Sequence, residues 1–156
     1  MAIKKPNKPE TLLQSTYQKF WQEFNIFSAA DDTFCKEFNP HPYGSIRSYQ
    51  DYSIGEPYAI CVGISFKKHE IRTSAYFGNL EAYLFYSEML KGRIERNVGK
   101  RLKWTSHQTK ASAVLYDEAD FDENHGWENA FQVIINDMCT MKRAFNWVPS
   151  KRTNDI

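Results

Sequence analysis

The sequence lacks any apolar run that approaches the roughly 20 residues a membrane-spanning helix needs. Residues 1–9 are basic and contain two prolines, and no apolar segment follows them, so we expect a solvated, disordered tail and not a signal peptide. Neither sign of charge dominates, because 20 Lys and Arg residues face 19 Asp and Glu residues, which leaves a net charge of +1. Total charge therefore gives no general attraction to nucleic acid or to an anionic membrane.

Cysteine is also scarce, with three widely spaced residues and no CxxC pair. This excludes a disulfide framework and favours a reducing, cytoplasmic setting. The Walker loop, the GxGxxG fingerprint and the nucleophile-elbow motif are all missing. The four histidines have no metal-ligand spacing to one another: His41, His69, His107 and His125. The sequence thus predicts no catalytic residue, no metal ligand and no cofactor.

Aromatic residues are what the chain has in abundance, with 11 Phe, 9 Tyr and 4 Trp among 156 residues. Large rings bury much area each, so a sizeable core fits within one domain of this length. We expect that domain to span residues 10–148, followed by a polar C-terminal tail at 149–156.

Helical periodicity marks three segments. The first helix is expected over about 10–27, with Leu13, Tyr17, Phe20 and Phe24 as its apolar face and Trp21 widening it. A second helix should begin after Asn79 and end at Gly99. Its apolar face is expected to comprise Leu80, Tyr83, Leu84, Ser87, Leu90, Ile94 and Val98. The last helix should begin near Asn124 and end at Pro149.

Period-two alternation predicts two antiparallel hairpins. One joins residues 60–66 to 71–77, and the other joins 102–104 to 111–116. A short strand is expected near 45–49. The fold class is therefore α+β, with a mainly antiparallel sheet of about five strands and three helices packed on one face. One face of the first hairpin is small and polar, open to solvent or to a ligand. The pairing between the hairpins stays open.

Several of these segments together resemble domain-of-unknown-function family 4268, a prokaryotic family. The matching pieces are the aromatic start Tyr17–Trp21, the hairpin from Ile60 to Leu80, the segment Ile94–Trp104, and Trp127 in its acidic context. The resemblance spans residues 17–145. It implies no established activity. Some relatives are joined to nuclease-like domains, which implies a loose association with DNA processing or defence against foreign DNA.

A nuclease core would need an acid-x-Lys triplet on a strand, with a further acid upstream. The nearest approach is Glu70-Ile71-Arg72, where Arg replaces Lys, and Asp51 and Glu56 could supply the other acids. A charged, solvated turn explains the same residues more simply. We therefore keep a metal-dependent hydrolase or nuclease only as the weakest alternative.

The acidic run 117–128 contains side chains that could bind a metal ion. Asp120, Asp122 and Asn124 have calcium-loop spacing, but His125 occupies the glycine position and Phe131 the bidentate glutamate position. A looser set of Asp120, Asp122, His125 and Glu128 is an alternative. Acids that precede a helix and complement its dipole are the preferred interpretation.

A basic segment at 91–110, with interleaved rings, is the strongest functional indication. Such a pattern suits a phosphate backbone and unstacked bases. The candidate nucleic-acid-binding residues are Arg72, Arg96, Lys100, Arg101, Lys103, Trp104, His107 and Lys110, and Arg47, Tyr49 and Tyr76 could extend the surface. Against this, basic residues also complement a helix C-terminus, and Trp104 alternates like a core residue.

The sequence therefore predicts an interaction module, with catalysis not expected. The first hypothesis is a nucleic-acid-associated accessory domain. The alternative is a protein-interaction or self-assembling domain, in which the basic segment meets the acidic run of a partner or of a second copy.

Overall fold

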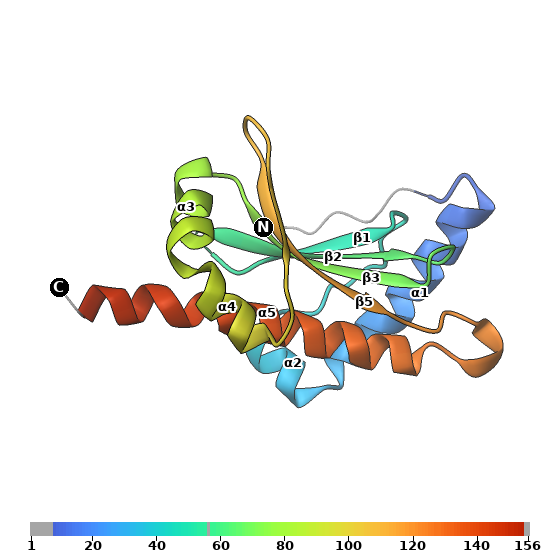
Figure 1. Ribbon diagram of the computed structural model, residues 1–156. Coiled ribbons are helices and arrows are strands. Elements are labelled where there is room, and N and C mark those ends of the chain that lie inside the picture. The colour runs from blue at the N-terminus through green and yellow to red at the C-terminus, as the bar shows by residue number, and fades with distance from the viewer. Residues whose placement is uncertain (1–7, 56, 155–156) are drawn as a thin grey trace.

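The computed structural model describes residues 8–55 and 57–154, with side chains to residue 145 (Figure 1). Its helices are α1 (Leu12–Ala29), α2 (Asp32–Glu37), α3 (Leu80–Phe85), α4 (Lys91–Val98) and α5 (Glu128–Asn154). A π-helical turn, η1 (Tyr86–Leu90), joins α3 to α4, and a 3-10 turn, η2 (Glu123–His125), precedes α5. The strands are β1 (Tyr49–Ser53), β2 (Tyr58–Ser65), β3 (Glu70–Phe77), β4 (Lys103–Ser106) and β5 (Ala111–Glu118).

The strands form one antiparallel sheet in the order β1-β2-β3-β5-β4. Both predicted hairpins are confirmed, as is the α+β class. The pairing that the sequence left open is β3 with β5, in which Arg72 lies opposite Tyr116 and Ala75 opposite Ala113. Because β4 then occupies an edge, the second hairpin continues the first into a single sheet.

The helices pack on one face of the sheet (Figure 1). Alternate residues of the central strands are buried there, among them Ile60, Val62, Ile71 and Ala75. The ring of Phe20, on α1, lies at the centre of an aromatic cluster that joins α1 to α5, with centroids 5.0–5.8 Å from those of Phe66, Phe121, Trp127 and Phe131. This face therefore contains the core.

The buried face of α1 differs from the prediction at the N-terminal end of the helix. Phe20, Trp21 and Phe24 are fully buried as predicted, but Leu13 is 54% exposed. The prediction for Leu13 was wrong because the first turn of α1 projects past the sheet (Figure 1). The helix begins after Thr11, whose hydroxyl accepts a hydrogen bond from the Gln14 N–H.

The second predicted helix is interrupted by the π turn η1. A π turn inserts a residue, so a single 3.6-residue stripe cannot continue through it. The buried residues are Tyr83, Tyr86 and Ile94, whereas Leu80 and Leu84 are about 40% exposed, contrary to prediction. The stop at Gly99 is confirmed, since this residue adopts a left-handed conformation with φ of 88°.

Three other element boundaries differ from the predicted ones. The first strand lies at 49–53, later than predicted, because the loop before it packs Gly44 against α1, where a Cβ would come within 2.6 Å of Gln18 and Gln22 atoms. The last helix begins at Glu128 and continues through Pro149 to Asn154, so the expected polar tail starts inside α5. Of the predicted N-terminal tail, residues 1–7 lie outside the described residues.

No helix in the described part of the chain combines the length and the apolar character needed to cross a membrane.

Candidate nucleic-acid interface

The side chains that alternate with the core residues form a second sheet face, which no described helix covers (Figure 1). We call it the open face. Small residues fill its centre, including Ala59, Cys61, Gly63, Ser74 and Ser112, and larger polar and aromatic residues stand between them: Tyr49, Asp51, Arg72, Tyr76, Tyr116 and Lys103. This arrangement agrees with the prediction that one hairpin face is small and polar.

One row of this face crosses four strands. The strand register places Tyr49, Gly63, Arg72 and Tyr116 side by side on β1, β2, β3 and β5. A Cβ on Gly63 would lie 3.1 Å from a terminal guanidinium nitrogen of Arg72. The Arg72 side chain therefore lies flat over the glycine, between two tyrosines.

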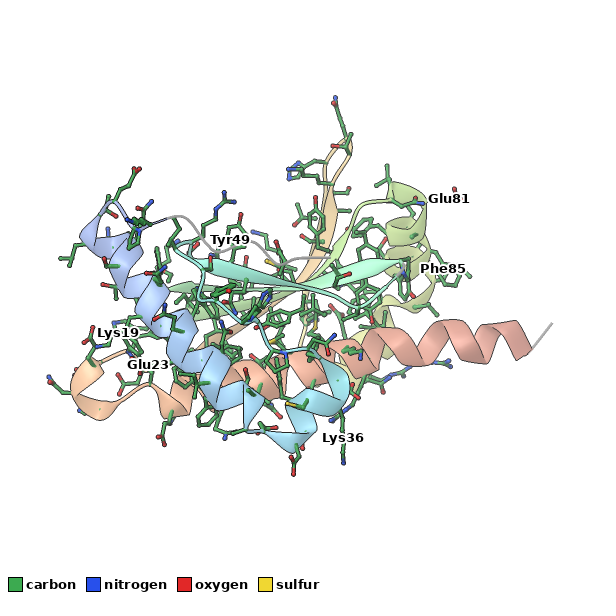
Figure 2. All side chains as sticks on the ribbon, turned by 180° about the vertical axis from the view of Figure 1, so that it is seen from behind. Lys19, Glu23, Lys36, Tyr49, Glu81 and Phe85 are labelled. Carbon is green, nitrogen blue, oxygen red and sulfur yellow. The ribbon has the colours of Figure 1, made fainter. Side chains whose placement is uncertain are left out.

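The β1 end of the row holds a second arginine. The Arg47 guanidinium donates a 2.8 Å hydrogen bond to the Tyr49 hydroxyl, and its central carbon lies 5.9 Å from that ring centroid. Tyr49 lies on β1, away from α5 (Figure 2). An arginine stacked on a tyrosine keeps the ring oriented and adds a positive charge beside it.

Exposure differs among the tyrosines. Tyr76 and Tyr116 are about 40% exposed, and Tyr49 is half-buried. An exposed ring that is held upright by sheet geometry offers a flat apolar surface with a polar edge. Such rings can stack on planar ligands without reorganising the sheet.

Charges on the open face are balanced. The Arg72 Nε atom is buried, has no hydrogen-bond partner among the described residues, and lies 4.0 Å from a Glu70 carboxylate oxygen. Among the described residues, this face carries three cations and three acids: Arg47, Arg72, Lys103, Asp51, Glu70 and Glu118. This face is therefore suited to stacking more than to gathering many phosphates.

Cys61, at the centre of the open face, is not an activated nucleophile. Burial raises the pKa of its thiol, and the neighbouring Asp51 raises it further. The thiolate is the reactive form, so this cysteine stays protonated and unreactive near neutral pH.

The predicted binding residues separate into several places. Arg72 and Lys103 lie on the open face. Trp104 faces the core, where its ring centroid lies 6.0 Å from that of Phe145 and its indole N–H donates to Glu95 at 3.1 Å. Its alternation as a core residue is thus the interpretation that the structure favours, and the ring is not presented for stacking on a base.

The rest of the basic segment is spread over the molecule. Lys100 forms an ion pair with Asp117 at 3.5 Å, and Arg101 is exposed beside it. His107 and Lys110 close the β4–β5 turn, where the His107 N–H donates to the Lys110 carbonyl at 2.7 Å. The sheet therefore divides residues 91–110 between two faces, and the segment does not form one continuous patch.

Arg96 lies in a groove between α4 and α5. The groove has a volume of about 660 Å³ and is lined by Arg93, Arg96, Asn97, Thr140, Arg143 and Ala144. We call it the arginine groove. The sequence did not reveal it, because Arg143 belongs to α5 and is 47 residues from Arg96 along the chain. Only the packing of α4 against α5 brings these side chains together.

A carboxyl pair, Asp137 and Asp117, lies beside Lys100, just beyond the C-terminal end of α4. Asp137 is buried on α5, and its Oδ2 atom has no hydrogen-bond partner among the described residues. Burial, reinforced by the charge of Asp117, raises the pKa of Asp137 to about 7, although Lys100 opposes the shift. This carboxyl group thus exchanges its proton near neutral pH.

The acidic run is organised by local contacts. His125 Nδ1 lies 2.8 Å from Asp120 Oδ2 and 3.9 Å from Asp122 Oδ2. The hydrogen bond that His125 donates to Asp120 raises the pKa of His125. The hydrogen bonds that Asp120 accepts from the Asp122 N–H and from His125 lower the pKa of Asp120. Within the described residues, no three His, Cys, Asp or Glu side chains are grouped to hold a metal ion.

The nuclease-like triplet does not form a carboxylate cluster with its expected partners in the described structure. Glu70 and Arg72 both lie on the open face, while Asp51 lies across β2 from β3. Glu56 is outside the described residues. Since the described acids converge on no common point, the geometry adds no support to the hydrolase hypothesis.

No family model, no curated protein and no solved structure matches this chain, so the resemblance to family 4268 stays a prediction.

Proposed function

We propose that this protein binds single-stranded nucleic acid on the open face. The observation that carries the proposal is the row Tyr49, Gly63, Arg72 and Tyr116, in which an arginine lies flat on the sheet between two rings. Sheet-based RNA-binding modules likewise use rings on an open antiparallel sheet to stack two or three bases.

Stacking on the exposed rings favours a single strand over a duplex as the ligand. The exposed rings of Tyr76 and Tyr116 can contact only bases whose faces are free, because paired bases are already stacked within the helix. The small residues between the rings leave room for bases to lie flat. Arg72 adds a planar cation to the same surface.

The charge balance limits the electrostatic contribution. Three cations, Arg47, Arg72 and Lys103, are available to contact phosphates. Since a single strand contributes about −0.7 to the salt slope per phosphate contact, the slope of log K against log salt should be no steeper than about −2.

The free cysteines and the family resemblance bear on where the protein works. Free thiols at Cys35, Cys61 and Cys139 suit a reducing compartment, so we propose a cytoplasmic protein. A role beside DNA-processing or defence enzymes, as the resemblance to family 4268 implies, would fit a module that holds unpaired strands.

Fluorescence anisotropy with labelled single-stranded DNA and RNA, and with the matching duplex, tests the proposal. We expect the single strands to bind more tightly, and Tyr116→Ala to weaken binding by about 1–2 kcal/mol, or roughly 5- to 30-fold, because one stacking surface is removed.

Tyr43→Ala is the matched control. Tyr43 is 40% exposed, like Tyr116, but lies in the loop before β1, outside the open face. Equal affinity for single strand and duplex, or equal weakening by the two substitutions, would reject the open face as the binding surface.

A further inference from the structure

The edge of the sheet at β4 has backbone groups available for pairing. β4 is the last strand in the sheet order and pairs with β5 alone. The His107 N–H donates to the Lys110 carbonyl, so these two residues form a hydrogen-bonded pair of the antiparallel ladder. Because such pairs alternate with non-hydrogen-bonded ones, the backbone N–H and C=O groups of Trp104 and Ser106 point away from β5. Among the described residues, these groups have no hydrogen-bond partner.

The opposite edge of the sheet, at β1, is partly blocked. Ser48 accepts a hydrogen bond from the Ile64 N–H, so the same alternation turns the Asp51 carbonyl away from β2. A ring nitrogen of His41 lies 2.6 Å from that carbonyl oxygen and caps it. A chain that paired with β1 would have to displace His41. β4 is therefore the edge better suited to accept another strand.

The fold holds β4 in place before any partner binds. The Glu95 carboxylate, on α4, accepts hydrogen bonds from the Leu102 N–H at 2.8 Å and from the Trp104 indole N–H at 3.1 Å. The Trp104 ring also packs near Phe145 on the core side. Because these contacts fix the strand, a partner that pairs with β4 does not have to order it first.

The surroundings of β4 are basic. Arg101 precedes the strand, Lys103 lies on it, and Lys110 follows in the β4–β5 turn, and all three side chains are exposed. None of them forms an ion pair with a described residue. Lysine on an edge strand opposes pairing with a second copy of the same chain, since like charges would meet. The same charges attract a strand that carries carboxylates.

We infer that β4 accepts an acidic, extended peptide of another protein as a further strand of the sheet. The peptide backbone pairs with the outward groups of Trp104 and Ser106. Its carboxylates meet the charges of Arg101, Lys103 and Lys110. In such strand addition, main-chain hydrogen bonds give affinity and side chains give specificity. The inference concerns the edge of the sheet and does not depend on nucleic-acid binding at the open face.

Fluorescence anisotropy with a labelled peptide of alternating glutamate and valine tests the inference. We expect it to bind at least about 10-fold more tightly than a lysine–valine peptide of the same length, and than the glutamate–valine peptide with a central proline. Ser106→Pro should weaken binding about 10-fold, because it removes an outward N–H without breaking a bond to β5. Ser53→Pro, which makes the same change at the β1 edge, should leave binding unchanged.

Amide hydrogen exchange, followed by NMR, locates the bound peptide. Saturating peptide should slow the exchange of the Trp104 and Ser106 amides about 10-fold or more, and should leave the Ser53 amide unchanged. The melting temperature of each variant without peptide checks that the fold is intact.

Equal binding of the glutamate and lysine peptides would overturn the inference, as would equal weakening by Ser106→Pro and Ser53→Pro, or an absence of protection at the Trp104 and Ser106 amides. Protection of these amides that rises with protein concentration alone would also overturn it, and would identify a second copy as the occupant. Ser106→Pro should leave oligonucleotide affinity unchanged, and Tyr116→Ala should leave peptide affinity unchanged, so the two proposals can fail separately.

Discussion

At the scale of single residues, the environment of a side chain decides its chemistry more than its type does. Asp120 and Asp137 are both aspartates, yet Asp120 is exposed and hydrogen-bonded, which lowers its pKa, while Asp137 is buried and has a pKa raised to about 7. Trp104 and Tyr116 show the same contrast among rings. The tryptophan lies against the core, and the tyrosine on the neighbouring strand faces solvent.

The buried carboxyl of Asp137 should make stability depend on pH. The unfolded chain loses this proton near pH 3.8, whereas the folded chain keeps it until about pH 7. Wild-type stability from this group is therefore full below pH 4, falls as the pH rises to about 7, and then levels. Asp137→Asn has no titrating group at this position, so it does not lose this stability. The free energy of unfolding of the variant minus that of the wild type should therefore increase by about 1–2 kcal/mol between pH 5 and pH 8.

Urea unfolding at the two pH values measures this difference. Asp51→Asn, at an exposed position on the open face, should follow the wild-type profile. If the stability of Asp137→Asn relative to wild type were the same at both pH values, Asp137 would not be protonated in the folded protein at pH 5.

At the scale of elements, helix ends and strand alternation were predictable because they depend on neighbouring residues. Gly99 ends α4, and alternation along β2 and β3 identified the core face and the open face. The π turn η1 was not predictable in this way. Leu80 and Leu84 lie in α3, before this turn, and they face outward because Tyr83 and Tyr86 pack against the core.

Two glycines at α4 provide a test of this local reasoning. Gly99→Ala should destabilise the protein by about 1 kcal/mol, because its φ of 88° is unfavourable for a residue with a Cβ. Gly92→Ala should stabilise it by up to about 1 kcal/mol, since the added Cβ would meet nothing within 4 Å and alanine favours a helix. Thermal or urea unfolding measures both, and effects of the same sign would contradict the assignment of the α4 end.

At the scale of the whole molecule, the sheet separates two surfaces. The helices cover one face and leave the other open (Figure 1). Because β3 pairs with β5, the two hairpins share one surface, and the open face extends from Tyr49 on β1 to Lys103 on β4. The arginine groove, between α4 and α5, belongs to the opposite side.

This separation predicts that the two surfaces act independently. Arg143→Gln should leave the affinity for single-stranded oligonucleotides unchanged, because Arg143 lies between α4 and α5 and outside the open face. The effects of Tyr116→Ala and Arg143→Gln on the free energy of unfolding should add within about 0.5 kcal/mol in the double variant, since the two residues lie on opposite sides of the sheet. A larger interaction energy, measured by a double-mutant cycle, would show that the two faces are coupled.

Local sequence patterns were enough to predict the α+β class, the two hairpins, the buried aromatic residues of α1 and the stop at Gly99, because periodicity and caps depend on neighbouring residues. Which basic residues come together depended on how distant elements pack. The sheet divided the segment 91–110, turned Trp104 inward, and placed Arg143 opposite Arg96, 47 residues away in the chain. Contacts between distant segments depend on how elements pack, and the spacing of residues along one chain does not encode that directly.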